Sequence, residues 1–380
     1  MYRFWKTGRS RGTSAARIVV VASALALILS PMPARTADRA TGTLVPSGPA
    51  KAGVDASRFN FAMHGTFEPF HVTTTRPVRD ALSARLVAAD TDVLVTATAA
   101  GPLALLTEQM AYHHIAQGRA GDQEWLVSFC VVCNTATRLV PKINGTPTRF
   151  VTAGVYDGLM VMQDVATGTI WNHITGAALL GPAVGSNLGP PGNVLHTTVK
   201  QLVAAAPDAR IAISDRVYFA GGRRHGTVEG ITLLGRSHGR PDARTGLSDV
   251  FIATLGTEDA RRPRMDLGLG VWWDGGSRYY PRDLIQRQGG ALIDRINGRT
   301  LLVYIDPDSS TPAAMFVSAT RAGVTGSTVR LDSGTVKDGV LLDSRGRRLT
   351  SERPQQVFTR WYGFALTFPG TSIYAPARSS

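Results

Sequence analysis

The sequence predicts a strand-dominated α+β fold made of two repeated halves, and three observations support this prediction. Short β-prone runs alternate with turn-forming Gly, Pro, Asn and Asp residues, whereas helical patterns are scarce. Segments of the second half resemble segments of the first half in the same order. Even without its first 37 residues, the chain is too long for one small core, which favours two domains or one duplicated domain.

The N-terminal 37 residues are typical of a secretory signal peptide. A basic leader without acidic residues precedes the 12-residue apolar run 18–29, and small residues follow near Ala34 and Ala37. The run is shorter than the about 20 apolar residues that span a bilayer, and no later stretch is longer. We therefore expect an exported protein, periplasmic or extracellular, with no transmembrane span after the leader. The Gly-, Pro-, Ala- and Thr-rich residues 38–58 predict a disordered lead-in.

The expected elements follow from local patterns in the rest of the chain. Runs rich in β-branched, aromatic and other apolar residues predict strands at 92–96, 124–130, 148–152, 159–162, 300–305 and 356–364. Apolar residues at helical spacing after Pro102 predict a helix over 102–116, and a second helix is expected over 197–206.

The predicted duplication aligns the cysteines of the first half with other residues in the second. Residues 124–139 align in sequence with 300–316, so that Cys130 matches Asp306 and Cys133 matches Ser309. Further matches in the same order pair 100–104 with 276–281, 166–170 with 332–336, 176–179 with 346–349, and 206–211 with 368–373. The sequence thus predicts a first repeat over 59–235 and a second, degenerate repeat over 258–380. Only the first could use sulfur chemistry.

The charge distribution argues against nucleic-acid binding. The formal charge is +13, and the six basic residues of the first 37 leave 13 − 6 = +7 for the remainder. These charges are spread along the chain and form no basic stripe interleaved with aromatic residues.

The chemistry-bearing motif is the pair Cys130 and Cys133, the only cysteines of the chain, in the segment Phe-Cys-Val-Val-Cys-Asn. Two thiols three positions apart can close a small disulfide ring or bind one metal ion. In an oxidising compartment such a pair persists as a disulfide unless a metal or a dedicated reductant keeps it open.

Several segments together resemble the domain-of-unknown-function 3179 family. They are Ala-Tyr-His-His at 111–114, the Cys-x-x-Cys segment 129–134, the segment 160–176 ending in Trp-Asn-His-Ile-Thr-Gly, and the closing segments Trp-Tyr-Gly at 361–363 and Phe-Pro-Gly-Thr at 368–371. His113 precedes Cys130 by 17 residues, which is the spacing of the family pattern. The resemblance covers roughly residues 85–375 and implies a fold and a site, but no reaction.

Four positions depart from that pattern. Val131 stands at the family's proline, Asn134 at its glycine, His114 at its glutamate and His173 at its glutamine. The resemblance makes His113 the companion of the two cysteines. His173 lies in a turn and could reach the site, although we expect it at the surface.

Three functions remain open for the cysteine pair. The first is binding of a soft metal, copper before zinc, because thiolates prefer such ions. The ligands would be Cys130, Cys133 and His113, with His173 and Met162 as further candidates, and the protein would have a metal donor or another protein as partner. The second is a structural disulfide in a non-catalytic envelope protein that binds a protein or glycan. The third is thiol–disulfide exchange, which needs an exposed, acidified cysteine.

Overall fold

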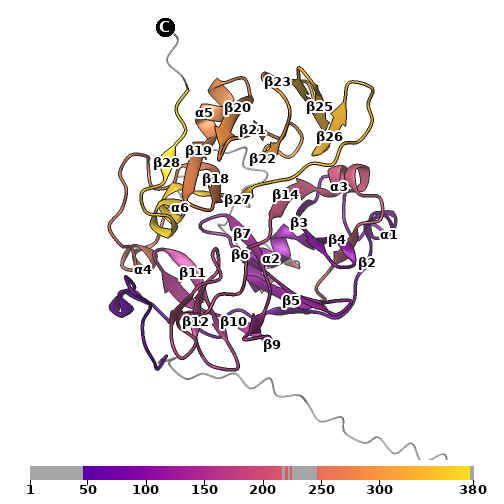
Figure 1. The fold of residues 1–380 in the computed structure, drawn as a ribbon. Helices are drawn as coiled ribbons and strands as arrows, with labels where there is room; N and C mark the ends of the chain where they lie inside the picture. Colours follow the sequence, from indigo (N-terminus) through magenta and orange to yellow (C-terminus); the bar gives the residue numbers. More distant parts are fainter. Residues whose placement is uncertain (1–45, 216–218, 221–222, 225–245, 377–380) are drawn as a thin grey trace, which may run out of the picture. The chain divides into compact units, whose positions relative to one another are not determined.

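A computed structural model describes residues 46–215, 219–220, 223–224 and 246–376 (Figure 1). Strands hold 43% of the residues and helices 13%, so the prediction of a strand-dominated α+β fold is confirmed. The predicted signal peptide and residues 236–245 of the predicted boundary between the repeats lie outside the described residues. Residues 46–58 of the predicted lead-in are described, and the Lys51 N–H donates to the Leu179 carbonyl over 2.8 Å.

The first half begins with a five-stranded sheet that receives strands from distant parts of the sequence. Its strands, in spatial order, are β14 (Val194–Thr198), β3 (Asp92–Thr98), β4 (Gly101–Leu106), β15 (Arg210–Ala212) and β2 (Arg76–Pro77). Helices α1 (Val78–Ser83) and α3 (Val199–Ala205) contribute Val78 and Val199 to the apolar cluster that contains Val93 of β3 and Ile211 of β15. The Thr198 side chain caps α3 by accepting the Gln201 N–H.

A second sheet carries the cysteine motif. Its order is β1 (Phe70–Val72), β5 (Ile115–Ala120), β6 (Gln123–Cys130) and β7 (Thr135–Leu139). Side chains alternate between the two faces of a strand. Trp125 and Val127 of β6 accordingly join one buried cluster, whereas Leu126 and Cys130 join another. Both faces of β6 are therefore covered by other side chains. This burial explains the continuous apolar run from which the strand was predicted.

A four-stranded antiparallel meander completes the first half and packs against the cysteine-bearing face of β6. Its strands are β10 (Phe150–Tyr156), β11 (Leu159–Asp164), β12 (Ile170–Asn172) and β13 (Ala178–Leu180). Phe150, Met162 and Trp171 share the buried cluster of Leu126 and Cys130. Buried Asp164 accepts hydrogen bonds from the Trp171 indole and from backbone N–H groups of Thr167 and Thr169, which fixes the turn between β11 and β12.

The second half contains three sheets in a similar order. The first sheet contains, in spatial order, β27 (Gln355–Arg360), β18 (Leu267–Trp273), β19 (Gly276–Pro281) and β28 (Ser372–Ile373). The second contains β20 (Ala291–Ile296), β21 (Arg299–Ile305) and β22 (Pro312–Phe316). The third contains β23 (Ala322–Thr325), β24 (Thr328–Leu331), β25 (Gly334–Lys337) and β26 (Val340–Asp343). Its helices are α4 (Asp249–Ile252), α5 (Arg282–Arg287) and α6 (Trp361–Thr367).

The strand order of the first sheet is the same in both halves. The order β14-β3-β4-β15 corresponds to β27-β18-β19-β28. A hairpin sheet and a four-stranded meander lie along the chain between β4 and β14 in the first half and between β19 and β27 in the second. Helix α3 follows β14 as α6 follows β27. This match supports the predicted duplication, which stays a prediction.

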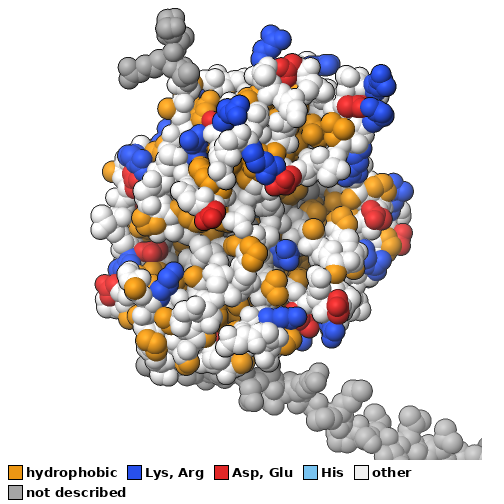
Figure 2. Space-filling model, in the orientation of Figure 1, with side chains coloured by type: hydrophobic (Ala, Val, Ile, Leu, Met, Phe, Trp, Pro, Cys, Tyr) orange, Lys and Arg blue, Asp and Glu red, His pale blue; other side chains and the backbone are white. Residues whose placement is uncertain are grey.

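The remaining elements are short. Residues 56–58 form the 3₁₀ helix Ala56–Arg58, α2 is Thr107–His113, and two small hairpins join β8 (Lys142–Ile143) to β9 (Thr146–Pro147) and β16 (Phe219–Ala220) to β17 (Arg223–Arg224). None of the helices in the described part of the chain has the length and apolarity needed to cross a membrane. On the face drawn in Figure 2, basic and acidic side chains are interspersed.

Two element predictions were wrong in part. The predicted helix over 102–116 is split, because Pro102–Leu106 belong to β4, which lies between β3 and β15, and only 107–113 are helical. The predicted strand over 356–364 ends at Arg360, where α6 begins. In both cases an apolar run continues through a strand-to-helix junction, so that periodicity alone does not locate the boundary.

Candidate functional site

The two cysteines lie on the turn between β6 and β7. Cys130 is the last residue of β6 and pairs with Thr135, the first residue of β7. The last residue of the turn, Asn134, has a φ of 59°. Asparagine tolerates this left-handed conformation better than most residues other than glycine. The turn can therefore form although asparagine replaces the glycine of the resembled pattern.

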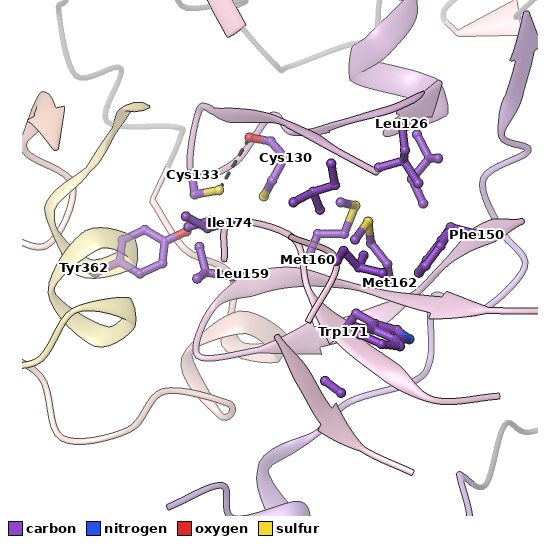
Figure 3. Close-up of a cluster of buried hydrophobic side chains, with 14 of the residues drawn as sticks. Leu126, Cys130, Cys133, Phe150, Leu159, Met160, Met162, Trp171, Ile174 and Tyr362 are labelled. Atoms are coloured by element: carbon purple, nitrogen blue, oxygen red, sulfur yellow. Dashed lines mark hydrogen bonds between the residues drawn. The ribbon is translucent and has the colours of Figure 1, made fainter. Parts of the chain in front are cut away.

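His173 reaches the same place from the turn after β12. The Asn172 side chain accepts the N–H groups of Ile174 and Thr175, and Gly176 closes the turn with a φ of 71°. His173 is 0% exposed, so the expectation that it lies at the surface was wrong. The turn faces inward because neighbouring Trp171 and Ile174 are buried in the core that surrounds the cysteines (Figure 3).

The donor atoms of Cys130, Cys133 and His173 form a compact group, all within 4.8 Å of one another. Cys133 Sγ and His173 Nε2 are 3.9 Å apart. Two atoms that bind one ion at about 2.0–2.3 Å in trigonal or tetrahedral geometry lie about 3.3–4.0 Å apart. The spacing of these donors therefore fits a single metal ion between them.

Ser128 holds the His173 ring in a suitable orientation. Ser128 and Cys130 point to the same face of β6, and Ser128 Oγ lies 3.3 Å from His173 Nδ1 and 3.2 Å from the His173 carbonyl oxygen. The hydroxyl can donate to that carbonyl and accept an Nδ1–H. In this tautomer the lone pair of Nε2 faces Cys133, as a metal ligand requires.

The two thiols differ in acidity. A hydrogen bond from the Cys133 thiol, opposed by burial and assisted by backbone N–H groups of Cys133, Met160 and Val132, lowers the pKa of Cys130 to about 7. Burial and the neighbouring Cys130 sulfur raise the pKa of Cys133 well above its ordinary value. Both thiols are free, and Cys133 Sγ donates to the Cys130 carbonyl over 3.6 Å. The pair thus favours one thiolate and one thiol near neutral pH.

The imidazole next to the sulfurs is uncharged at neutral pH. Burial, assisted by nearby His114, lowers the pKa of His173 to about 3. Burial likewise lowers the pKa of His114 to about 4, and its Nδ1 lies 2.9 Å from the Phe129 carbonyl. Only neutral imidazole binds a metal, so His173 needs no deprotonation to act as a ligand.

The second half of the chain completes the site. The Arg360 N–H and Thr359 Oγ1 donate to the Cys133 carbonyl over 3.1 Å and 3.2 Å, and Arg360 Nε donates to the Val132 carbonyl over 2.9 Å. Tyr362 packs in the same cluster as the sulfurs, and its hydroxyl donates to the Gly158 carbonyl over 2.9 Å (Figure 3). Residues more than 200 positions apart thus enclose the cysteine turn.

The other predicted ligands have different surroundings. Both ring nitrogens of buried His113 have partners, with Nδ1 lying 2.6 Å from the Glu68 carbonyl oxygen and Nε2 3.0 Å from Ser214 Oγ. His113 is not a member of the compact donor group. Met162 is buried in the same cluster as the cysteines. The roles of His113 and Met162 as ligands stay predictions.

Sequence reasoning ranked His173 below His113 and did not identify Ser128 or Arg360. One signal could have found His173, because a histidine, whose ring can bind a metal, stands where the resembled pattern has glutamine. The identity of Ser128 and Arg360 gave no such signal, because their role comes from the strand face of β6 and from the contact between the two halves.

Comparison with known proteins is consistent with this placement. No curated protein and no solved structure matches the chain. The profile described as "Protein of unknown function (DUF3179)" matches residues 74–368, which include the cysteine turn, the His173 turn and the β27–α6 segment. The chain therefore belongs to the DUF3179 family of proteins of unknown function.

Proposed function

We propose that the protein binds one soft metal ion through Cys130, Cys133 and His173. The observation that carries the proposal is the placement of two sulfurs and one imidazole nitrogen, all buried, within 4.8 Å of one another. Thiolate and imidazole donors favour Cu(I), Zn(II) and related ions. Ser128 contacts the ring, and the β27–α6 segment is hydrogen-bonded to the buried cysteine turn, which supports a pre-organised set of ligand atoms.

Copper in its monovalent state is the first candidate and zinc the second. Structural zinc sites almost always have four protein ligands. The group holds three, and no further His, Cys, Asp or Glu joins it within the described ranges. Cu(I) is stable with two or three soft ligands, so that the donor set satisfies it without a water molecule.

The proposal is tested by measuring the metal retained by the purified full chain after reduction, incubation with Cu(I) or Zn(II) and desalting. We expect one equivalent of copper in the wild type. Removal of a ligand in Cys130→Ser or His173→Gln should weaken Cu(I) binding by more than the about 10–100-fold that loss of a supporting residue costs.

His113→Gln is the matched control, because it replaces another buried histidine whose ring nitrogens lie against Glu68 and Ser214. It should retain copper. Retention by His173→Gln together with loss by His113→Gln would contradict the ligand set and favour the one expected from family spacing. A wild-type protein that binds neither metal and has a stable disulfide would support a structural disulfide in an envelope protein with a protein or glycan partner.

A second candidate is thiol–disulfide exchange, favoured by the unequal acidities of the two thiols. An acidified Cys130 beside a protonated Cys133 is the arrangement of an attacking and a resolving thiol. Burial of both thiols counts against exchange with folded protein substrates. Rapid reaction of the native protein with a small aromatic disulfide at pH 7, with no metal retained, would favour this function over metal binding.

We further infer that the protein acts outside the cytoplasm. The support is the basic leader followed by the apolar run 18–29 and small residues. Cell fractionation and N-terminal sequencing of the expressed protein test this inference. Recovery of the uncleaved chain from the cytoplasm alone would contradict it.

A further inference from the structure

Arg360 places a positive charge beside the cysteine turn. Arg360 is 1% exposed. Its guanidinium donates from Nε to the Val132 carbonyl over 2.9 Å and from Nη1 to the Met265 carbonyl over 2.8 Å. Its backbone N–H donates to the Cys133 carbonyl. These hydrogen bonds fix the side chain against the turn that holds the two sulfurs.

Within the part of the chain that the structure describes, this charge has no carboxylate partner. Ion pairs join other arginines of the described residues to aspartates, as in Arg262 with Asp266 and Arg278 with Asp294, but none involves Arg360 within those residues. Carbonyl oxygens supply only partial charge. A buried ion without a counter-ion is strongly unfavourable. Two buried tyrosines, Tyr362 and Tyr279, and both cysteines act electrostatically on Arg360. Burial raises the pKa of each tyrosine well above its ordinary value, so the sulfurs are the groups of this set that can supply negative charge.

A charge count follows from the groups around the turn. Binding of a metal deprotonates both cysteines, which contributes two negative charges. Arg360 contributes one positive charge, and His173 and Tyr362 are neutral. A monovalent ion then makes the buried assembly neutral, whereas a divalent ion leaves one uncompensated positive charge.

We infer that Arg360 is the specificity-determining residue that makes this site prefer a monovalent soft cation, Cu(I), over Zn(II). The inference rests on the proposed function and extends it, because donor softness alone admits both metals. Arg360 contacts no metal in this scheme and acts through its fixed charge.

The test is competition between Cu(I) and Zn(II) for the full chain, with chelators of known affinity, in wild type, Arg360→Met and Arg360→Lys. Methionine removes the charge, so the Cu(I) assembly becomes negative and the Zn(II) assembly neutral. We expect the Cu(I)-over-Zn(II) preference to fall by about tenfold or more. Arg360→Lys keeps the charge and should keep most of the preference.

Arg282→Met is the matched control, because Arg282 is also buried, has no carboxylate partner within the described residues and donates to the Ser310 carbonyl on the corresponding turn of the second half, away from the sulfurs. It should leave the preference unchanged. If Arg360→Met does not fold, Arg360→Gln replaces it, since an amide can still donate to the Val132 carbonyl, and the same loss of preference is expected.

The possible outcomes distinguish a failure of the inference about Arg360 from a failure of the proposed metal site. Equal weakening of both metals in the uncharged variants overturns the inference, because it shows a positioning role without charge selectivity, and leaves the metal site intact. An unchanged ratio overturns it as well. A wild-type protein that binds neither metal overturns the proposed function and the inference with it.

Discussion

The turn that carries Cys130 and the turn that carries Asp306 are built alike but hold different atoms. Each connects the last two strands of a hairpin sheet, and the fifth residue of each is left-handed, with a φ of 59° at Asn134 and 57° at Ser310. The same backbone shape therefore occurs with thiols in one half and without them in the other.

The atom at the first position of each turn accepts the same backbone groups. Asp306 Oδ1 accepts the N–H groups of Asp308 and Ser309 over 3.1 Å and 2.9 Å, together with the Ser309 hydroxyl. In the first half, the N–H groups two and three residues after Cys130 point at its sulfur. The turn is thus suited to a negative atom at this position, and a carboxylate fills it where no thiolate can.

The helix residue that each turn contacts from the opposite half also differs. The third residue of α3 is Gln201, whose amide donates to Asp306 Oδ1 over 2.6 Å. The third residue of α6 is Gly363, next to Cys133. A glutamine satisfies the carboxylate in one turn, whereas the glycine leaves room at the sulfurs. The Asp306 turn is therefore a closed network of hydrogen bonds, whereas the cysteine turn keeps its sulfur atoms available as ligands.

The largest effect expected from this comparison concerns stability. Asp306→Ala leaves buried donors of Gln201 and Ser309 without their acceptor and should lower the free energy of unfolding by about 3 kcal/mol. Cys130→Ser keeps an acceptor for the same backbone groups and should cost about 1 kcal/mol. Urea denaturation of the metal-free proteins measures both, and equal costs would refute the distinction between the two turns.

A smaller effect should appear in acid, because only the cysteine turn has an imidazole nitrogen next to a sulfur. The pKa of His173 is about 3 in the folded protein and about 6.5 when unfolded, so between these values the unfolded state binds the extra proton. Stability conferred by the neutral ring is therefore complete above pH 6.5 and is lost as the pH falls toward 3.

His173→Gln should reduce the slope of unfolding free energy against pH by up to about 1.4 kcal/mol per pH unit between pH 4 and 6. Denaturation of wild type and variant at several pH values measures the slope. His71→Gln, at an exposed histidine of β1, should change it less. Identical slopes for wild type and His173→Gln would show that the ring is not buried.

The smallest effect is expected at the glycine of α6. A methyl group on Gly363 would lie 2.9 Å from Leu159 Cδ2 and 3.6 Å from Cys133 Cβ, so only the flexible leucine must move. Helix propensity favours alanine by about 1 kcal/mol, which offsets that strain. Gly363→Ala should change thermal stability little and leave metal retention intact. Loss of metal in this variant would place the sulfurs closer to α6 than described.

Much of the fold was predictable because its strands have strong local signals. The strands at 124–130 and 300–305 are apolar β-prone runs buried on both faces, and the cysteine spacing located the site on the turn after the first of them. The junctions at β4–α2 and β27–α6 were not predictable, because an apolar run there serves both a strand and a helix.

The composition of the site was predictable only in part. His173 comes from a turn 40 residues after Cys133, and its polar neighbours suggested exposure although the ring is buried. Arg360 approaches from the other half, and no local pattern specifies that contact. The two cysteines were found from their spacing, whereas Ser128 and Arg360 were not, because their roles depend on a shared strand face and on packing between the halves.

The contact between Arg360 and the cysteine turn also determines when the site can exist. Arg360 follows Val132 by 228 residues, so a growing or translocating chain presents its two thiols long before their counter-charge and cover. During that interval the thiols are open to oxidation and to unselective metals. For the proposed metal site, selectivity would arise only after the second half has folded against the first, so metal loading before that point would be governed by the metals present in the compartment.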